Sequence, residues 1–399
     1  MNHHTATIVD RYLELGLRLG RHVEGFVDAY YGPASLSDRV ARESVRDPSA
    51  LVADAASLLA DLDAGMESDA LEPSRRRWLR AQVVGMHTSA RRLDGAAIDY
   101  VDEVERCYGV RPSLRDESIF AAAHRRLEAA VPGDGPIGDR MISWREAQAI
   151  PVEVLPSVVA SLAEDLRERT QRRFGLPEGE HVEWELATAQ PWSGFNFYEG
   201  RLRSRVAINV DLPVLATSIG HLVAHEAYPG HHTEHVRKEA GLVRGRGWME
   251  ESIFCVGTPQ CLLAEGLADL ALEVIADDRP DALVAEHLAA LGVSFDADVA
   301  AEVRAASGAL DAVRGNAAWL LHADGRSVDE VIAYLERWGP MSRSRAEKAV
   351  EFLTSPTWRA YISCYVEGLP LCRQWVAGDP SRFERLVSDQ MVPADLMVS

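Results

Sequence analysis

Four of the thirteen histidines fall within twelve residues, in the segment HLVAHEAYPGHH. Glu226 directly follows His225, and a histidine followed by a glutamate on a helix is the core of zinc-hydrolase motifs. In such motifs the histidine binds zinc and the glutamate accepts a proton from the attacking water. The pattern predicts a metal site with Glu226 as its general base.

The second ligand of this motif normally stands four residues after the first, but Pro229 occupies that place. Proline removes a backbone donor and clashes with the preceding turn, while Gly230 supplies backbone freedom. We therefore expect the helix to bulge at these two residues and to carry His231 into the missing position. The predicted ligands are His225 and His231, with His232 as the alternative second ligand.

A catalytic zinc site usually has three protein ligands and one open position. In the segment LLAEGLADLALE, an acidic stripe repeats every four residues on an otherwise apolar helix, through Glu265, Asp269 and Glu273. Burying such a stripe is costly unless it meets a cation or hydrogen-bond donors. We predict Glu265 as the third ligand and Asp269 as the acceptor that orients a ligand histidine. Glu250 and Glu251 are rival ligands.

Two other histidines lie close to the motif. His221 and His225 are one helical turn apart and form a third possible ligand pair. His235 is predicted to be exposed to solvent. Because two histidines and a carboxylate around one open position suit zinc best, the predicted cofactor is Zn²⁺.

The elements that must position these residues are mostly helical. Apolar residues recur at helical spacing through Ile8, Tyr12, Leu15 and Leu19, and similar patterns occupy much of the chain. Between residues 181 and 210 the pattern alternates and favours a hairpin or small sheet. We predict a mainly α fold with an N-terminal helical region over residues 1–175. A catalytic region with the small sheet and C-terminal helices covers residues 176–399.

Composition narrows the choice of partners. The formal net charge of −19 disfavours nucleic acid, and no apolar run is long enough to span a membrane. The first twenty residues lack the apolar core of a signal peptide, and five cysteines without CxxC spacing suggest free thiols. These features predict a cytoplasmic protein without nucleic-acid or membrane partners.

The octet HEAYPGHH resembles the HExxPGHH signature of a bacterial family known as domain of unknown function 885, whose members look like zincin-type metallopeptidases. AINV, ending at Asn209, is similar to a strand of that family. AEGLADLALE is similar to its Glu-Gly-Trp segment, with Leu267 in place of Trp. SPTWRAYISCYVEG is similar to its Pro…Tyr-x-x-Gly segment, through Pro356, Tyr365 and Gly368. By motif, the resemblance covers the second half of the chain.

This resemblance implies a helical, gluzincin-type zincin fold with a small sheet or hairpin beside the metal site. In such folds an edge strand of the sheet pairs with an extended peptide, and RVAINV over residues 205–210 is the natural candidate. Asn209 would then hold a substrate amide. A Tyr365 hydroxyl near the metal would stabilise an oxyanion, and Arg373 would bind a substrate carboxylate.

The predicted function is therefore a zinc-dependent hydrolase, in particular a peptidase, that acts on a peptide or small amide substrate. The alternative is a non-catalytic metal- or peptide-binding protein on the same scaffold. The presence of Glu226 disfavours the alternative, because metal binding alone needs no base beside the ligand.

Overall fold

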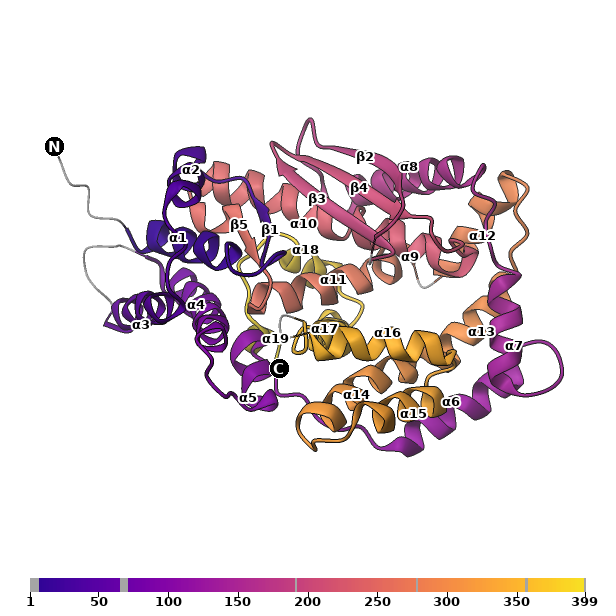
Figure 1. Ribbon diagram of the computed structural model, residues 1–399. Coiled ribbons are helices and arrows are strands. Elements are labelled where there is room, and N and C mark those ends of the chain that lie inside the picture. The colour runs from indigo at the N-terminus through magenta and orange to yellow at the C-terminus, as the bar shows by residue number, and fades with distance from the viewer. Residues whose placement is uncertain (1–6, 65–70, 191, 278, 356–357, 398–399) are drawn as a thin grey trace.

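The computed structural model describes residues 7–64, 71–190, 192–277, 279–355 and 358–397. Over these residues the chain is mainly helical with two small β-sheets, which confirms the predicted fold class (Figure 1). Pro356, part of the C-terminal motif, lies outside the described residues.

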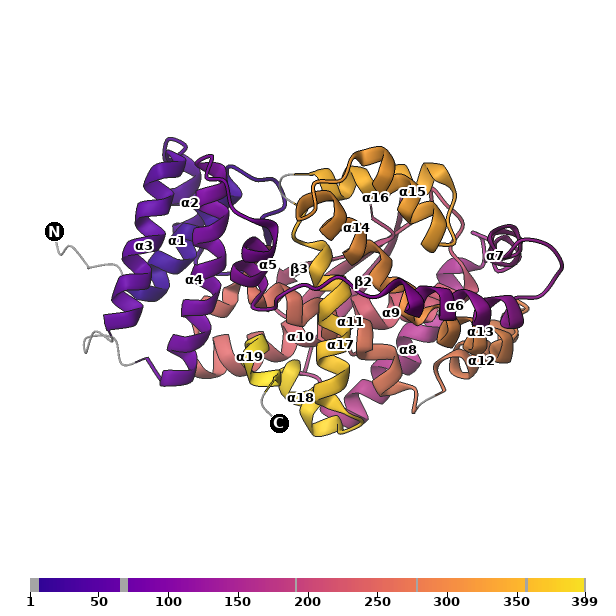
Figure 2. The same cartoon turned by 90° about the horizontal axis from the view of Figure 1, so that it is seen from below.

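The first helices form a bundle at one end of the molecule (Figure 2). Helix α1 begins at a capping box between Thr7 and Asp10, and its apolar stripe, including Tyr12, is buried against Trp78. The bundle comprises α1 (Ile8–Gly20), α2 (Ala34–Arg42), α3 (Pro48–Ala64) and α4 (Pro73–Leu93).

A second and larger core is built from the rest of the chain. Its outer helices are α5 (Tyr100–Tyr108), α6 (Glu117–Ala130), α7 (Ile137–Glu146), α8 (Leu155–Phe174), α12 (Pro280–Ala290), α13 (Ala297–Ser307), α14 (Ala312–His322), α15 (Val328–Trp338), α16 (Arg343–Thr354), α18 (Pro380–Leu386) and α19 (Pro393–Leu396). Each core draws residues from both sides of position 175, so a division into regions there stays a prediction.

The larger sheet contains β2 (His181–Ala187), β3 (Gly194–Gly200) and β4 (Arg203–Asn209), in the order β2-β4-β3. β3 and β4 form an antiparallel hairpin whose two connecting residues, Arg201 and Leu202, have positive φ angles. β2 pairs in parallel with the other side of β4. The prediction that residues 205–210 form an edge strand was therefore wrong, because β4 is central and β3 is the edge strand nearer α9 (Ala216–Glu226).

The smaller sheet pairs a strand from the start of the chain with a strand from its second half, beside the core of the N-terminal bundle. β1 (Val27–Tyr30) pairs antiparallel with β5 (Ile253–Cys255), and the register shifts between Val27 and Ala29. β1 also contacts β3, so the two sheets lie near each other. A π-helical turn (Glu239–Arg244) and a 3₁₀ turn (Met249–Ser252) lead from α10 (His231–Lys238) to β5.

At the centre of the molecule, α11 (Pro259–Ile275) lies beside α17 (Ile362–Val376) (Figures 1 and 2). The helices approach closely because glycines face each other at the contact. A Cβ atom on Gly266 would lie only 2.4 Å from the carbonyl oxygen of Gly368. These glycines come from two of the motifs noted in the sequence, and their contact places the two motifs side by side.

Candidate metal centre

The HEAYPGHH segment is a broken helix. α9 ends at Glu226, a cis peptide bond joins Tyr228 to Pro229, and α10 begins at His231. Gly230 fits tightly at the break, because a Cβ atom there would lie 2.0 Å from the carbonyl oxygen of His225. The interruption expected at Pro229 and Gly230 is therefore present, and it brings the side chains of His225 and His231 together.

Three side chains converge on one position between α9, α10 and α11. His225 Nε2 lies 3.1 Å from His231 Nε2 and 3.5 Å from Glu265 Oε2, and His231 Nε2 lies 3.9 Å from Glu265 Oε1. Ligands of a tetrahedral zinc ion at ordinary bond lengths are about 3.3–3.4 Å apart. These three residues can therefore hold a metal ion.

The donor set also fits a cation chemically. Glu265 Oε2 is buried and has no hydrogen-bond partner among the residues that the structure describes, although a buried carboxylate oxygen normally needs one. Burial raises the pKa of Glu265 to about 7, against the opposing charge of His225. Burial, followed by the charge of His225, lowers the pKa of His231 well below its usual value. His231 is consequently neutral near pH 7, as a metal ligand must be.

Asp269 lies one helical turn beyond Glu265 and contacts the other side of the His225 ring. Its Oδ1 is 3.0 Å from His225 Nδ1 and 3.4 Å from His221 Nε2. Burial lowers the pKa of His225, but the contact with Asp269 outweighs it and raises the value to about 10. His221, His225 and Asp269 are also close enough to hold a metal. His221 is half-exposed, however, and lies beside Asp269 rather than beside His231.

Tyr361, from the turn before α17, donates a hydrogen bond of 2.7 Å to Glu265 Oε1. The glycine contact between α11 and α17 brings this hydroxyl to the carboxylate. The contribution of Tyr361 was missed by the sequence analysis, although its spacing of four residues from Tyr365 was visible. The Tyr365 ring contacts the Tyr361 ring edge-on and is 40% exposed. Within the described part of the chain, Tyr365 forms no hydrogen bond to a predicted ligand, so it borders the site without contacting the ligand atoms in this way.

His232 faces away from this position, toward the larger sheet. It is fully buried, with Nδ1 2.8 Å from Ser204 Oγ and Nε2 2.8 Å from Glu180 Oε2. Glu180 also accepts a hydrogen bond of 2.8 Å from the hydroxyl of Tyr228. The structure thus places His232 in a buried polar network, apart from the other two histidines.

His235, predicted to be exposed, is buried. Its ring stacks on Tyr198 with centroids 4.5 Å apart and contacts Phe254 edge-on at 5.6 Å. The prediction was wrong because the break at the start of α10 turns this helix inward against β3. Burial lowers the pKa of His235 to about 3.

Glu226 is 8% exposed and lies against the edge strand β3. Its backbone carbonyl accepts a hydrogen bond of 2.6 Å from Asn196 Nδ2. Its Oε1 is 3.3 Å from the place where a Cβ atom of Gly194 would stand, so the absent side chain leaves room for the carboxylate. Burial raises the pKa of Glu226, although the charges of His225 and His221 oppose the shift.

Two further predicted residues are engaged elsewhere. Asn209 Nδ2 donates to the Gln190 carbonyl at 3.0 Å, and its Oδ1 accepts from the Asp211 N–H at 3.0 Å, so the side chain closes a loop at the end of β4. Arg373 pairs with Glu273, with Nε 3.1 Å from Oε2, which occupies the guanidinium predicted to bind a substrate carboxylate.

The rival ligands Glu250 and Glu251 belong to a different buried cluster. Glu250 Oε2 accepts a hydrogen bond of 2.7 Å from Arg75, and Glu251 Oε2 accepts one of 3.3 Å from Gln260. Neither belongs to the groups that could hold a metal among the described residues.

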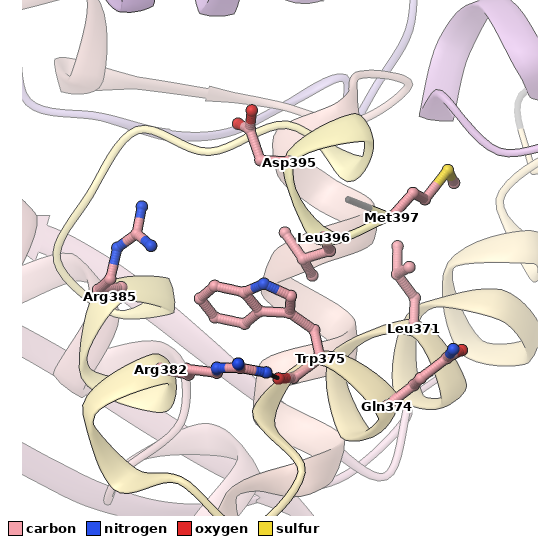
Figure 3. Close-up of a pocket in the computed structure, with 8 residues that line it drawn as sticks. All are labelled: Leu371, Gln374, Trp375, Arg382, Arg385, Asp395, Leu396 and Met397. Carbon is pink, nitrogen blue, oxygen red and sulfur yellow. Dashed lines mark hydrogen bonds between the residues drawn. The ribbon is translucent and has the colours of Figure 1, made fainter. Parts of the chain in front are cut away.

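A hollow of about 760 Å³ lies near the C-terminus and is unrelated to this centre (Figure 3). The side chains of Arg382 and Arg385 flank the ring of Trp375 there. Both arginines already have acidic neighbours, Asp379 and Asp389. None of the residues that line this hollow is a candidate ligand or base. The hollow is therefore not the place where the proposed chemistry would occur.

No protein-family model matches the chain, and no curated protein matches it. The fold is similar to that of a candidate lipoprotein from Colwellia psychrerythraea, with a TM-score of 0.52 and 16% identity. That alignment covers 87% of this chain, which spans 65% of the other protein's length. A candidate lipoprotein of unknown function from Shewanella oneidensis aligns with a TM-score of 0.48 and 12% identity, over 99% of this chain and 79% of that one.

An M32 carboxypeptidase from Deinococcus radiodurans R1 aligns with a TM-score of 0.39 and 13% identity, over 98% of this chain and 92% of that one. The first similarity concerns the fold alone, and the two with TM-scores under 0.5 support no functional assignment. Among the described residues, no helix is long and apolar enough to cross a membrane, and the cytoplasmic location stays a prediction.

Proposed function

We propose that this chain is a zinc-dependent hydrolase that cleaves peptide or small amide bonds. The observation that carries the proposal is the convergence of His225 Nε2, His231 Nε2 and a Glu265 carboxylate oxygen, with Glu226 next to the first of them. Two imidazoles and one carboxylate are a ligand set of catalytic zinc sites.

His225, His231 and Glu265 would hold the metal, and Asp269 and Tyr361 would orient two of these ligands. Zinc in such a site supplies a Lewis acid that polarises the scissile carbonyl and makes water a better nucleophile near neutral pH. The role of Asp269 and Tyr361 is positional. Asp269 contacts His225 Nδ1 rather than Nε2, and Tyr361 contacts Glu265 Oε1, whereas Glu265 Oε2 has no hydrogen-bond partner among the described residues.

Glu226 would take a proton from the attacking water and deliver it to the leaving amine. The next residue after a ligand on a helix points about 100° away, so Glu226 lies beside the ligand set without belonging to it. Burial raises the pKa of its carboxyl, which makes it a stronger base.

The edge strand β3 would align the substrate. It has a neighbour on one side only within its sheet, and it begins at Gly194, beside the Glu226 carboxylate. An extended peptide that pairs with β3 would pass its backbone in front of that base. The Tyr365 hydroxyl would supply a donor to the oxyanion from the opposite helix, α17.

The deciding experiment replaces Glu226 with Gln, which keeps the shape of the side chain but removes the base. The variant should retain stoichiometric zinc by metal analysis, while its hydrolysis of peptides selected from a library falls by about 10²–10⁴-fold. Chelation should abolish wild-type hydrolysis, and zinc should restore it.

Equal turnover by the wild type and Glu226→Gln would refute the mechanism. If the zinc-loaded wild type binds library peptides and cleaves none, the non-catalytic alternative is correct. Loss of zinc in Glu226→Gln would make Glu226 a ligand and overturn the proposed division between ligands and base.

A further inference from the structure

The edge strand β3 presents free backbone groups next to the candidate base. The Asn209 N–H donates to the Ser193 carbonyl at 2.9 Å, and hydrogen-bonded pairs alternate along an antiparallel ladder. The backbone groups of Gly194 and Asn196 therefore point away from β4. Among the residues that the structure describes, no backbone group of β3 forms a hydrogen bond with an element other than β4.

One face of β3 carries aromatic side chains. Phe195 and Phe197 alternate with the buried residues Asn196 and Tyr198, so both rings lie on the face of the sheet that is turned away from the core. The centroids of the two rings are 4.6 Å apart, and Trp192 adds a third ring 5.8 Å from Phe195. All three side chains are partly exposed. We call these three residues the aromatic face.

A positive charge beside the aromatic face is compensated. Arg205 stands opposite Phe197 on β4, and its guanidinium carbon lies 4.2 Å from the centroid of the Phe197 ring. The same guanidinium forms ion pairs with Glu185 and, at 3.7 Å, with Glu199. The aromatic face therefore offers apolar rings to a ligand rather than a free charge.

The free edge and the aromatic face both end at the metal centre. A Cβ atom on Gly194 would lie 3.3 Å from Glu226 Oε1, and Asn196 Nδ2 donates to the Glu226 carbonyl at 2.6 Å. Proteins usually protect an exposed strand edge with charged residues or proline. The sequence from Gly194 to Phe197 contains neither, so this part of β3 is open to pairing with an extended chain.

Strand geometry determines which side chains of such a chain would touch the rings. Residues that stand directly opposite each other on paired strands place their side chains on the same face. A peptide bound to the backbone of Gly194 and Asn196 would thus have one residue opposite Phe195 and another opposite Phe197. One residue separates these two, and its side chain would point to the other face.

We propose that the aromatic face selects peptides with aromatic or large apolar side chains at two positions separated by one residue. This inference rests on the proposed function, and it names the substrate class as extended peptides with this alternating pattern beside the scissile bond. Phe195 and Phe197 would each contact one of the two side chains, and Trp192 would extend the contact surface beyond Phe195.

The test compares two peptides of identical composition. In acetyl-Ala-Ala-Phe-Ala-Phe-Ala-amide the two aromatic residues alternate with alanine, whereas in acetyl-Ala-Ala-Phe-Phe-Ala-Ala-amide they are adjacent. Only the alternating peptide can place both rings on the aromatic face. Calorimetric titration of the zinc-loaded Glu226→Gln protein, in which hydrolysis is suppressed, should show about 3- to 10-fold tighter binding of the alternating peptide.

Two further substitutions locate the effect. Phe197→Thr, added to Glu226→Gln, removes one ring but keeps a residue that favours strands, and it should make the two affinities equal. Leu186→Thr is the control, because it removes an exposed apolar side chain from β2, on the far side of β4 from the free edge, and should keep the preference. The comparison of the two peptides does not depend on the folding of either variant. Equal affinity for both peptides, or an unchanged preference in Phe197→Thr, would overturn the proposal.

Hydrolysis of the same two peptides and of a peptide library is measured separately with the zinc-loaded wild type. Cleavage without a preference for the alternating pattern would refute the role of the aromatic face and leave the proposed function standing. A binding preference for the alternating peptide without any cleavage would refute the proposed function and leave the role of the aromatic face standing. Absence of both would refute both.

Discussion

The contact between Gly266 and Gly368 gives a quantitative test of how the metal site is positioned. A Cβ atom on Gly266 would lie 2.4 Å from the Gly368 carbonyl oxygen and 2.8 Å from Cys372 Sγ, whereas ordinary contacts begin near 3.4 Å. Gly266→Ala would therefore force α11 and α17 apart by about 1 Å. An equal lengthening of the 2.7 Å bond from Tyr361 to Glu265 would take it beyond hydrogen-bond range.

Two consequences follow for Gly266→Ala. Overpacking of a well-filled interface should lower the free energy of unfolding of the metal-free protein by about 1–3 kcal/mol, measured by urea titration. Loss of the hydrogen bond that orients a ligand should weaken zinc affinity by about 10- to 100-fold, measured by competition with a chromophoric chelator.

Two control variants separate these effects. Tyr361→Phe removes the hydrogen bond without moving the helices, so it should weaken zinc affinity to a similar extent. Gly138→Ala, in α7, places its Cβ where no atom lies within 4 Å, and it should keep zinc affinity while gaining up to about 1 kcal/mol of stability. Wild-type zinc affinity in both Gly266→Ala and Tyr361→Phe would refute the view that α17 positions Glu265.

Three further outcomes are expected. Metal analysis should find that His231→Ala loses most of its zinc, whereas His232→Ala keeps its zinc but unfolds at lower urea concentration, because it breaks a buried network. Glu265→Gln should weaken zinc affinity more than Asp269→Asn, because the first neutralises a ligand and the second only alters its orientation. The pKa of His235 is about 3 in the folded protein and about 6.5 when unfolded, so the unfolded state binds more protons below pH 6.5. Stability of the metal-free protein should therefore fall with decreasing pH, and between pH 7 and 5 the wild type should lose about 2 kcal/mol more than His235→Phe.

Local rules of chain geometry predicted part of this arrangement. A proline followed by a glycine leaves a helix few backbone conformations, because proline cannot continue the regular hydrogen bonding. The break between Glu226 and His231 follows from that constraint. The acidic stripe on α11 was visible because charges at four-residue spacing stand out on an apolar helix. Both inferences depended on residues close together in the sequence.

Long-range pairing could not be predicted in the same way. Alternation shows which face of a strand is buried, but it does not show which strand lies at the edge, so β4 was assigned the place that β3 occupies. The hydrogen bonds from Asn196 to Glu226 and from Tyr361 to Glu265 each join segments that lie far apart in the chain. A repeating pattern of residue types along the sequence cannot predict such long-range contacts.

Two predicted ligands, His231 and Glu265, are positioned by glycines that take no part in the proposed reaction. Gly230 permits the break that turns His231 toward His225, and the glycine pair brings Tyr361 to Glu265. Glycines at these places add no charge, donor or acceptor, so their substitution should change zinc affinity through position alone. The chemical groups and the groups that position them are therefore separable by experiment. Variants of the positioning glycines should lose zinc while the intrinsic basicity of the Glu226 carboxylate stays the same. Added zinc should restore hydrolysis to these glycine variants but not to Glu226→Gln.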